Sequence, residues 1–170
     1  GEGSTAEAEH AGAELRLLSG TSIIGSIYAT EAATAPQLDF KIKCSGGSHR
    51  INACDIVGDA TPFVEVTGGE LTVTGKFYNT NLTVGQIATV TAGELNILDS
   101  RFVWPNGARV VPAVEQSGTG VLRMVGCTVD PTITTAGVAV KFNTDRPGNY
   151  VEHGAFGIHS VTIPAGALAG

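Results

Sequence analysis

A step of 24 residues recurs through the middle of the chain. Ile42, Val66, Val90 and Val114 are spaced 24 residues apart, and Val140 follows 26 residues later. Each lies in a short run rich in β-branched residues, and these runs span 38–44, 63–66, 87–90, 110–114 and 138–142. A fixed period of this length is typical of supersecondary units stacked on one another. Because the repeated unit contains strand-like runs and no helical pattern, it predicts an all-β solenoid.

Each repeat contains a second run that follows the first. Residues 38–44 (LDFKIKC) alternate apolar and polar side chains, which is the pattern of a strand with one buried face. The second runs also alternate, and they open at Ile51, Leu71, Leu95 and Leu122. The sequence therefore predicts two strand series per turn, with the apolar positions of both series facing a common core.

Two neighbouring repeats share five of eight residues where the first run meets the second. VTGGELTV at 66–73 aligns without gaps with VTAGELNI at 90–97. Glycine has no Cβ, so we expect Gly69 and Gly93 at a corner where the backbone bends or stacked turns approach closely. The glutamate after each glycine then points outward. We expect the two glutamates to form a solvated outer ladder with weak mutual repulsion, rather than a binding pair.

The second runs share a form that has a known counterpart. The segments 71–77, 95–102 and 122–129 each have apolar positions two residues apart, then a small or polar bend, then Phe or Val. This form resembles the turn unit of right-handed parallel β-helices of the pectate-lyase-like and phage-tailspike group, over roughly residues 38–142. The resemblance implies an all-β, single-stranded, right-handed parallel β-helix of about 4–6 turns with irregular caps.

The repeat divides the chain into four parts. The β-helix is expected over residues 38–144, and the small, acidic segment 1–14 is expected to be a flexible arm. A solenoid exposes open strand edges at both ends, and these edges need cover. We expect residues 15–37 to form an N-terminal cap or first turn, and residues 145–170 to form a C-terminal cap or extension.

The composition narrows the classes of partner and site. The net charge is -6, and the ten basic residues do not cluster, which argues against nucleic acid or an anionic membrane surface as a partner. No apolar run is long enough to span a membrane, so we expect no membrane insertion. Cys44, Cys54 and Cys127 are odd in number and have no CxxC spacing. We interpret them as small buried apolar side chains, and we expect no metal and no cofactor.

Catalytic candidates are few. No nucleophile motif or phosphate loop is present, and His49 lies in a turn (SGGSHR) where we expect it to be exposed. Polysaccharide hydrolysis requires two carboxylates, roughly 6.5–9.5 Å apart in inverting enzymes. Asp55 and Asp99 fall at comparable bends two turns apart, so they are expected at roughly 9–10 Å and are weak catalytic candidates.

One loop has the composition of a carbohydrate contact. Trp104 is the only tryptophan and borders a Pro-Asn-Gly turn, where its ring could stack on a sugar while Asn106 and Arg101 supply hydrogen bonds. Tyr78 falls at the corresponding place one turn earlier. The alternative is that Trp104 is buried under its own loop or at a contact between subunits.

The function is predicted chiefly from the resemblance. The leading interpretation is a structural and host-surface attachment module of a phage tail spike, tail fibre or related virion protein, which is a homotrimer in contact with cell-surface glycan and other virion proteins. Its location is then the virion. The alternatives are a polysaccharide-degrading enzyme (a glycoside hydrolase or polysaccharide lyase, or a fragment of one) and a bacterial autotransporter adhesin located outside the cell or on its surface. The shortage of catalytic clusters favours a protein that is not an enzyme.

Overall fold

The chain folds as a column of stacked β-strands. The computed structural model describes residues 13–29, 40–80, 86–103, 112–129, 140–151 and 161–162. These residues form thirteen strands and no helix, and every strand pairing among them is parallel. Outside the described residues lie residues 1–12 of the arm expected over 1–14, most of the C-terminal extension, and the loop with Trp104 and Asn106. Glu14, the last residue of the expected arm, is the first residue of a strand.

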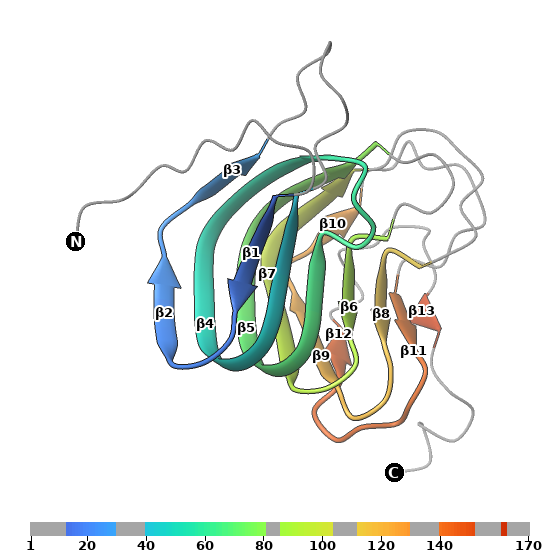
Figure 1. Cartoon of the computed structure of the whole chain (residues 1–170). Helices are drawn as coiled ribbons and strands as arrows, with labels where there is room; N and C mark the ends of the chain where they lie inside the picture. The colour runs from blue at the N-terminus through green and yellow to red at the C-terminus, as the bar shows by residue number, and fades with distance from the viewer. Residues whose placement is uncertain are drawn as a thin grey trace.

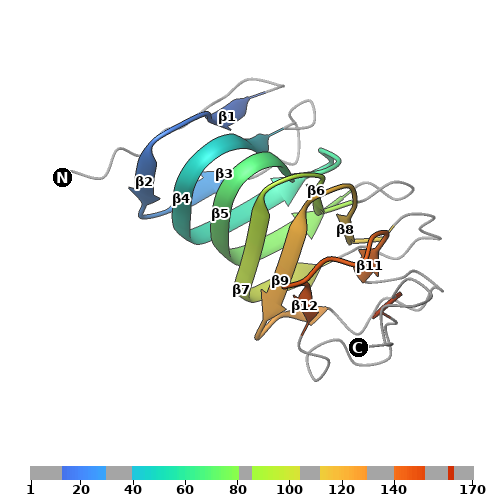
Figure 2. The same cartoon turned by 90° about the horizontal axis from the view of Figure 1, so that it is seen from below.

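The strands line three sides of the column, seen from two directions in Figures 1 and 2. Face A contains β1 (Glu14–Leu17), the first parts of β4 (Lys41–Gly58) and β5 (Val64–Asn79), β6 (Ala88–Val90), β8 (Val114–Gln116), β11 (Val140–Phe142) and β13 (Val161–Thr162). Face B contains β2 (Thr21–Ile24), the middle of β4 and β5, the start of β7 (Glu94–Val103), β9 (Val121–Val125) and β12 (Tyr150–Val151). Face C contains β3 (Ile27–Ala29), the ends of β4, β5 and β7, and β10 (Thr128–Val129).

The pairing confirms a parallel β-solenoid. From Ile42 the chain returns to face A at Val64, Ala88, Val114 and Val140, which makes about four turns. The layer formed by β1, β2 and β3 stacks on β4 at the N-terminal end. The right-handed sense of the coil stays a prediction from the resemblance.

The prediction of two strand series per turn is wrong, because each turn has three. The second run bends in its middle, so that its first half lies in face B and its second half in face C. In β7 the bend lies at Asp99, which has a φ of 44°, and in the next turn it lies at Gly126, with a φ of 67°. Asp tolerates this left-handed conformation better than most residues, because its short side chain can bond to nearby backbone.

The constant step of 24 residues places some repeats in the wrong register. Val66 does pair with Val90, as expected, but Ile42 pairs with Val64 rather than Val66. Val90 pairs with Gln116 rather than Val114. Both errors amount to two residues, and a shift of two residues keeps a side chain on the same side of a strand. The inward and outward assignments therefore remain right although the pairing differs.

Inward-facing side chains from the three faces fill the column. The predicted core positions Leu71, Leu95 and Leu122 are paired in register and fully buried. On face C the rings of Phe77 and Phe102 pack with their centroids 5.9 Å apart. Such close packing of apolar side chains supplies most of the stability that a solenoid has, because neighbouring turns bury each other's faces.

A column of glycines forms the corner between faces A and B, as the sequence predicted. Gly20, Gly47, Gly69 and Gly93 have φ values of 72° to 79°, which is the left-handed region. A Cβ on Gly69 would lie 2.5 Å from the carbonyl carbon of Gly46 and from the carbonyl oxygen of Gly47 in the turn below. The corner therefore requires glycine both for its dihedral angles and for the close approach of stacked backbones.

Substitutions of three glycines separate these two requirements. We expect Gly25→Ala to be nearly neutral, because a Cβ there meets nothing within 4 Å and φ is ordinary. Gly20→Ala also meets nothing, but its positive φ should lower the unfolding free energy by about 1–2 kcal/mol. Gly69→Ala combines a positive φ with backbone overlap, so it should lower the unfolding free energy by clearly more than Gly20→Ala does. Urea denaturation of the three variants checks this order, and a Gly69→Ala variant as stable as Gly25→Ala would contradict it.

Candidate functional site

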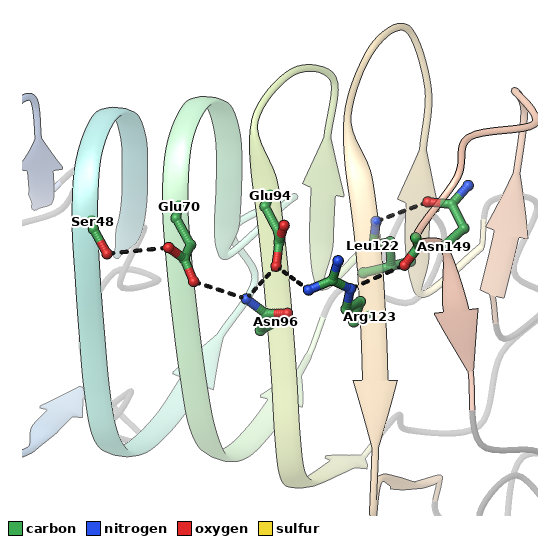
Figure 3. Close-up of polar contacts among 8 residues, drawn as sticks. Ser48, Glu70, Glu94, Asn96, Leu122, Arg123 and Asn149 are labelled. Carbon is green, nitrogen blue, oxygen red and sulfur yellow. Dashed lines mark hydrogen bonds and ion pairs between the residues drawn. The ribbon is translucent and has the colours of Figure 1, made fainter.

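Polar side chains form a connected row on the outer side of face B (Figure 3). The Ser48 hydroxyl donates to Glu70 Oε2 at 3.2 Å, and Asn96 Nδ2 lies 3.5 Å from Glu70 Oε1. The same amide donates to Glu94 Oε1 at 3.1 Å, and that oxygen also accepts from Arg123 Nη1 at 2.6 Å. We call Ser48, Glu70, Glu94, Asn96 and Arg123 the polar row; it crosses four successive turns.

The polar row contains a pair of like charges that its neighbours compensate. Glu70 and Glu94 are directly opposite each other in the parallel register, as expected for an outer ladder. Like charges in that arrangement destabilise a sheet. Here the Asn96 amide donates to both carboxylates and the Arg123 guanidinium pairs with Glu94, so the repulsion is offset within the row. The carboxylates are therefore already engaged by the chain itself.

The polar row ends in contacts that hold a later segment of chain. Arg123 Nε donates to the Gly148 carbonyl at 3.1 Å, and Asn149 Oδ1 accepts from the Leu122 backbone N–H at 3.0 Å. These contacts join β9 to the turn before β12 (Figure 3). Side chains of the polar row thus link the successive turns to one another and to the last layer of face B.

The outward side of face A carries charges of both signs. Lys43 lies 2.5 Å from Glu14 Oε1 and 3.9 Å from Glu65 Oε2, and Lys141 lies 3.7 Å from Glu115 Oε1. The hydrogen bond from Lys43, followed by that from Arg16, lowers the pKa of the Glu14 carboxyl. The same bond to Glu14 raises the pKa of Lys43. Each of these ion pairs with Lys43 or Lys141 joins neighbouring layers of the column.

The two aspartates proposed as catalytic candidates occupy different rows of the sheet. Asp55 pairs with Lys76, and Lys76 pairs in turn with Arg101. Asp99 lies two residues before Arg101, at the bend with positive φ. The expectation of comparable bends is therefore wrong. A catalytic role for either aspartate stays a prediction. Asp55 Oδ1 is buried and has no hydrogen-bond partner among the described residues.

Two of the predicted glycan-contact residues lie in the described part of the chain. Arg101 is exposed on face C, and Tyr78, which pairs with Val103, is half-buried on the neighbouring strand. They alternate along their strands with the buried residues Phe102 and Phe77, so both lie on the outer side. The structure therefore brings Arg101 and Tyr78 onto one face, while Trp104 and Asn106 lie outside the described residues.

A polar pair inside the column was missed from the sequence. His49 is only 5% exposed, contrary to the expectation of an exposed turn residue, and it lies in the inward row of Leu71. The Ser22 hydroxyl and His49 Nδ1 are 2.8 Å apart, and His49 Nε2 lies 2.9 Å from the Gly46 carbonyl oxygen. A carbonyl oxygen can only accept, so Nε2 carries a proton and donates to Gly46, and in the neutral ring Nδ1 then accepts from the Ser22 hydroxyl. The pair ties β2 to β4 through the core.

The cysteines occupy core positions, as the sequence predicted. Cys44, Cys54 and Cys127 are free and buried. The Cys44 thiol lies 3.4 Å from the Gly68 carbonyl oxygen, and the Cys127 thiol lies 3.3 Å from that of Ile97. Among the residues that the structure describes, no group of three or more His, Cys, Asp or Glu side chains is arranged to hold a metal ion. No helix of that part of the chain is long and apolar enough to cross a membrane.

Burial of Cys54 should make the fold less stable in alkali. Loss of solvation raises the pKa of this thiol to about 12 from a usual value of 9.0. The unfolded chain therefore ionises first, and stability falls as pH rises above about 9, by up to about 1.4 kcal/mol per pH unit. Urea midpoints at pH 8 and pH 10 measure the loss. We expect Cys54→Ala to show a smaller loss over that interval, and an equal loss in both proteins would contradict the assignment.

The shared amide of Asn96 should matter more than an ordinary surface hydrogen bond. Asn96→Ala leaves Glu70 opposite Glu94 without their common donor, and we expect a loss of about 1 kcal/mol in unfolding free energy. Glu70→Gln in the Asn96→Ala background removes the repulsion and should restore most of that loss. Chemical denaturation at low and high salt checks both, since added salt should weaken the effect of Asn96→Ala. Failure of the second substitution to restore stability would contradict the explanation.

Comparisons with known proteins add no relative. No protein-family model, no curated protein and no solved structure matches the chain. The fold is therefore established from the pairing and burial described above, and proposals about function depend on the chain's own geometry.

Proposed function

We propose that the chain is a structural and surface-attachment module, of the kind found in a phage tail spike, tail fibre or related virion protein. The main support for the proposal is that the charged side chains on the outer side of the column are already engaged by one another. Charged side chains of face A and of the polar row bond to one another from turn to turn. Catalytic sites instead gather groups whose charges are kept available for substrate. A column stiffened along its length suits a protein that bears load and presents a surface.

We further propose that attachment is to cell-surface glycan, through the outer side of face C. Tyr78 supplies an aromatic surface and Arg101 supplies donors on neighbouring strands, which are the groups that bind hydroxyl-rich ligands. Three copies in a homotrimer would convert weak single contacts into strong attachment. The partners proposed are therefore the chain itself, glycan and other virion proteins, at the surface of a virion.

Cleavage of polysaccharide is a second proposal with one observation in its favour. The buried oxygen of Asp55 has no hydrogen-bond partner among the described residues, and unpartnered buried polar atoms are rare outside sites that use them. The different rows of Asp55 and Asp99 weaken the idea that these two act as a pair.

The interpretation as a bacterial adhesin shares the attachment role with the leading proposal. It differs in predicting that the protein is a monomer.

Binding to a panel of purified bacterial capsule and O-antigen polysaccharides tests attachment. We expect at least one to bind, and Tyr78→Ala to weaken that binding about tenfold or more through loss of stacking. Tyr150→Ala is the matched control, since Tyr150 is an exposed tyrosine on face B, and its binding should be unchanged. Assays for new reducing ends run in parallel. Absence of binding across the panel would contradict attachment to glycan, while released reducing ends would favour the enzyme.

A further inference from the structure

Large apolar side chains that are exposed lie only at the two ends of the described column. Leu18, Ile23 and Tyr28 are 64%, 74% and 67% exposed, and all three belong to the first layer. The remaining two are Val125 and Tyr150, toward the C-terminal end. Between residues 40 and 103 the described residues include none. Exposed apolar residues grouped at one end of the column favour a contact surface at that end.

The first layer also has backbone groups available for pairing. Among the described strands, β1, β2 and β3 each pair with β4 and with no other strand. One edge of each strand therefore presents N–H and C=O groups to which no described strand is hydrogen-bonded. Open edges of this kind pair readily with a strand from another chain. The edge strands are four, four and three residues long, which is enough for specific pairing.

We propose that a second copy of this chain covers the first layer, with the two columns joined N-terminal end to N-terminal end about a two-fold axis. An axis that passes at Leu15, normal to face A and perpendicular to the column, makes the two copies of β1 antiparallel. With Leu15 opposite Leu15 of the second copy, Glu14 faces Arg16 of the second copy, and the reverse contact follows by symmetry. Charges are thus complementary across the axis. Arg16 is 67% exposed and uses only Nε in its bond to Glu14.

The same axis brings the exposed apolar residues together. A two-fold axis through face A exchanges the positions of faces B and C. Ile23 on face B is therefore on the same side of the dimer as Tyr28 on face C of the second copy, and this juxtaposition occurs twice. An apolar pair between an aromatic and a β-branched residue stabilises neighbouring strands. The contact is closed, because each copy uses the same surface, so it produces a dimer and not a fibre.

Stacking of the N-terminal end on the C-terminal end of another copy fits less well. The last described strands of the three faces, β10, β12 and β13, are two residues long. Each of them offers an edge half as long as that of β1 or β2. Joining the two N-terminal ends pairs the two copies of the four-residue β1 and brings Ile23 and Tyr28, two of the three most exposed apolar side chains, to the joint.

Light scattering on the full chain tests the proposal. We expect a mass that is an even multiple of the 17.4 kDa chain, and Ile23→Lys should halve it with an unchanged circular dichroism spectrum. Tyr150→Lys is the matched control, because Tyr150 lies in the same outward row at the opposite end and its variant should keep the native mass. If the chain also packs as a trimer, the native protein has six copies and the Ile23→Lys variant has three. If it does not, the native protein has two copies and the variant has one. A native mass of one or three chains, or halving by Tyr150→Lys as well, would overturn the proposal.

Disulfide trapping tests the axis itself. When Glu14→Cys and Arg16→Cys chains are mixed and oxidised, the two new thiols face each other across the antiparallel pair and should form a linked heterodimer. Either variant oxidised alone should link much less, because the two identical positions are offset from each other by two residues along the strands. Native cysteines are buried and do not compete. Equal linkage in all three samples, or none in the mixture, would contradict this register.

Discussion

Close backbone contact at the corner between faces A and B is the constraint on which the column depends. Stacked turns can keep parallel hydrogen bonds on all three faces only if the chain turns at the same place in each layer. Glycines with left-handed dihedral angles supply that turn from Gly20 to Gly93, and their missing Cβ atoms leave room for the backbone of the next layer. Because the corner recurs, each inward row continues through the column, and Leu71 lies on Leu95 and Leu95 on Leu122.

The outer rows set the register that the core alone leaves open. Inward rows of valine, isoleucine and leucine would tolerate a shift of two residues, since apolar side chains would again face the core. The polar row and the charges of face A would not tolerate it, because Asn96 would lose Glu70 and Lys43 would lose its acidic neighbours. These surface groups therefore contribute specificity of pairing more than large amounts of stability. The same engagement is the basis of the structural role proposed above.

The sequence predicted the architecture better than the site. Alternation along strands depends only on apolar side chains facing inward, and it was visible at Ile42, Leu71 and Phe77 alike. The predicted register is wrong where the chain passes from face C to the next face A. That connection differs in length between turns, from Gly58–Val64 to Val103–Val114. The three-sided cross-section was missed because the alternation in β5 runs unbroken through the bend at Gly75. In β7 the buried Ile97 and Ser100 are three residues apart, but one such shift also fits a bend within a single strand series. His49 was assigned to an exposed turn because the sequence does not reveal a serine, 27 residues earlier, that satisfies it in the core.

Distances between spin labels along one outward row test the parallel stack most directly. Arg16, Glu65, Glu115 and Lys141 lie in one row of face A, and Arg16 is separated from the other three by two, four and five strand steps. Neighbouring strands are about 4.8 Å apart, so the backbone separations should be roughly 10, 19 and 24 Å. The account predicts pulsed electron resonance distances that rise in this order in equal steps per layer. Distances that do not increase with the number of turns would contradict a solenoid with this register.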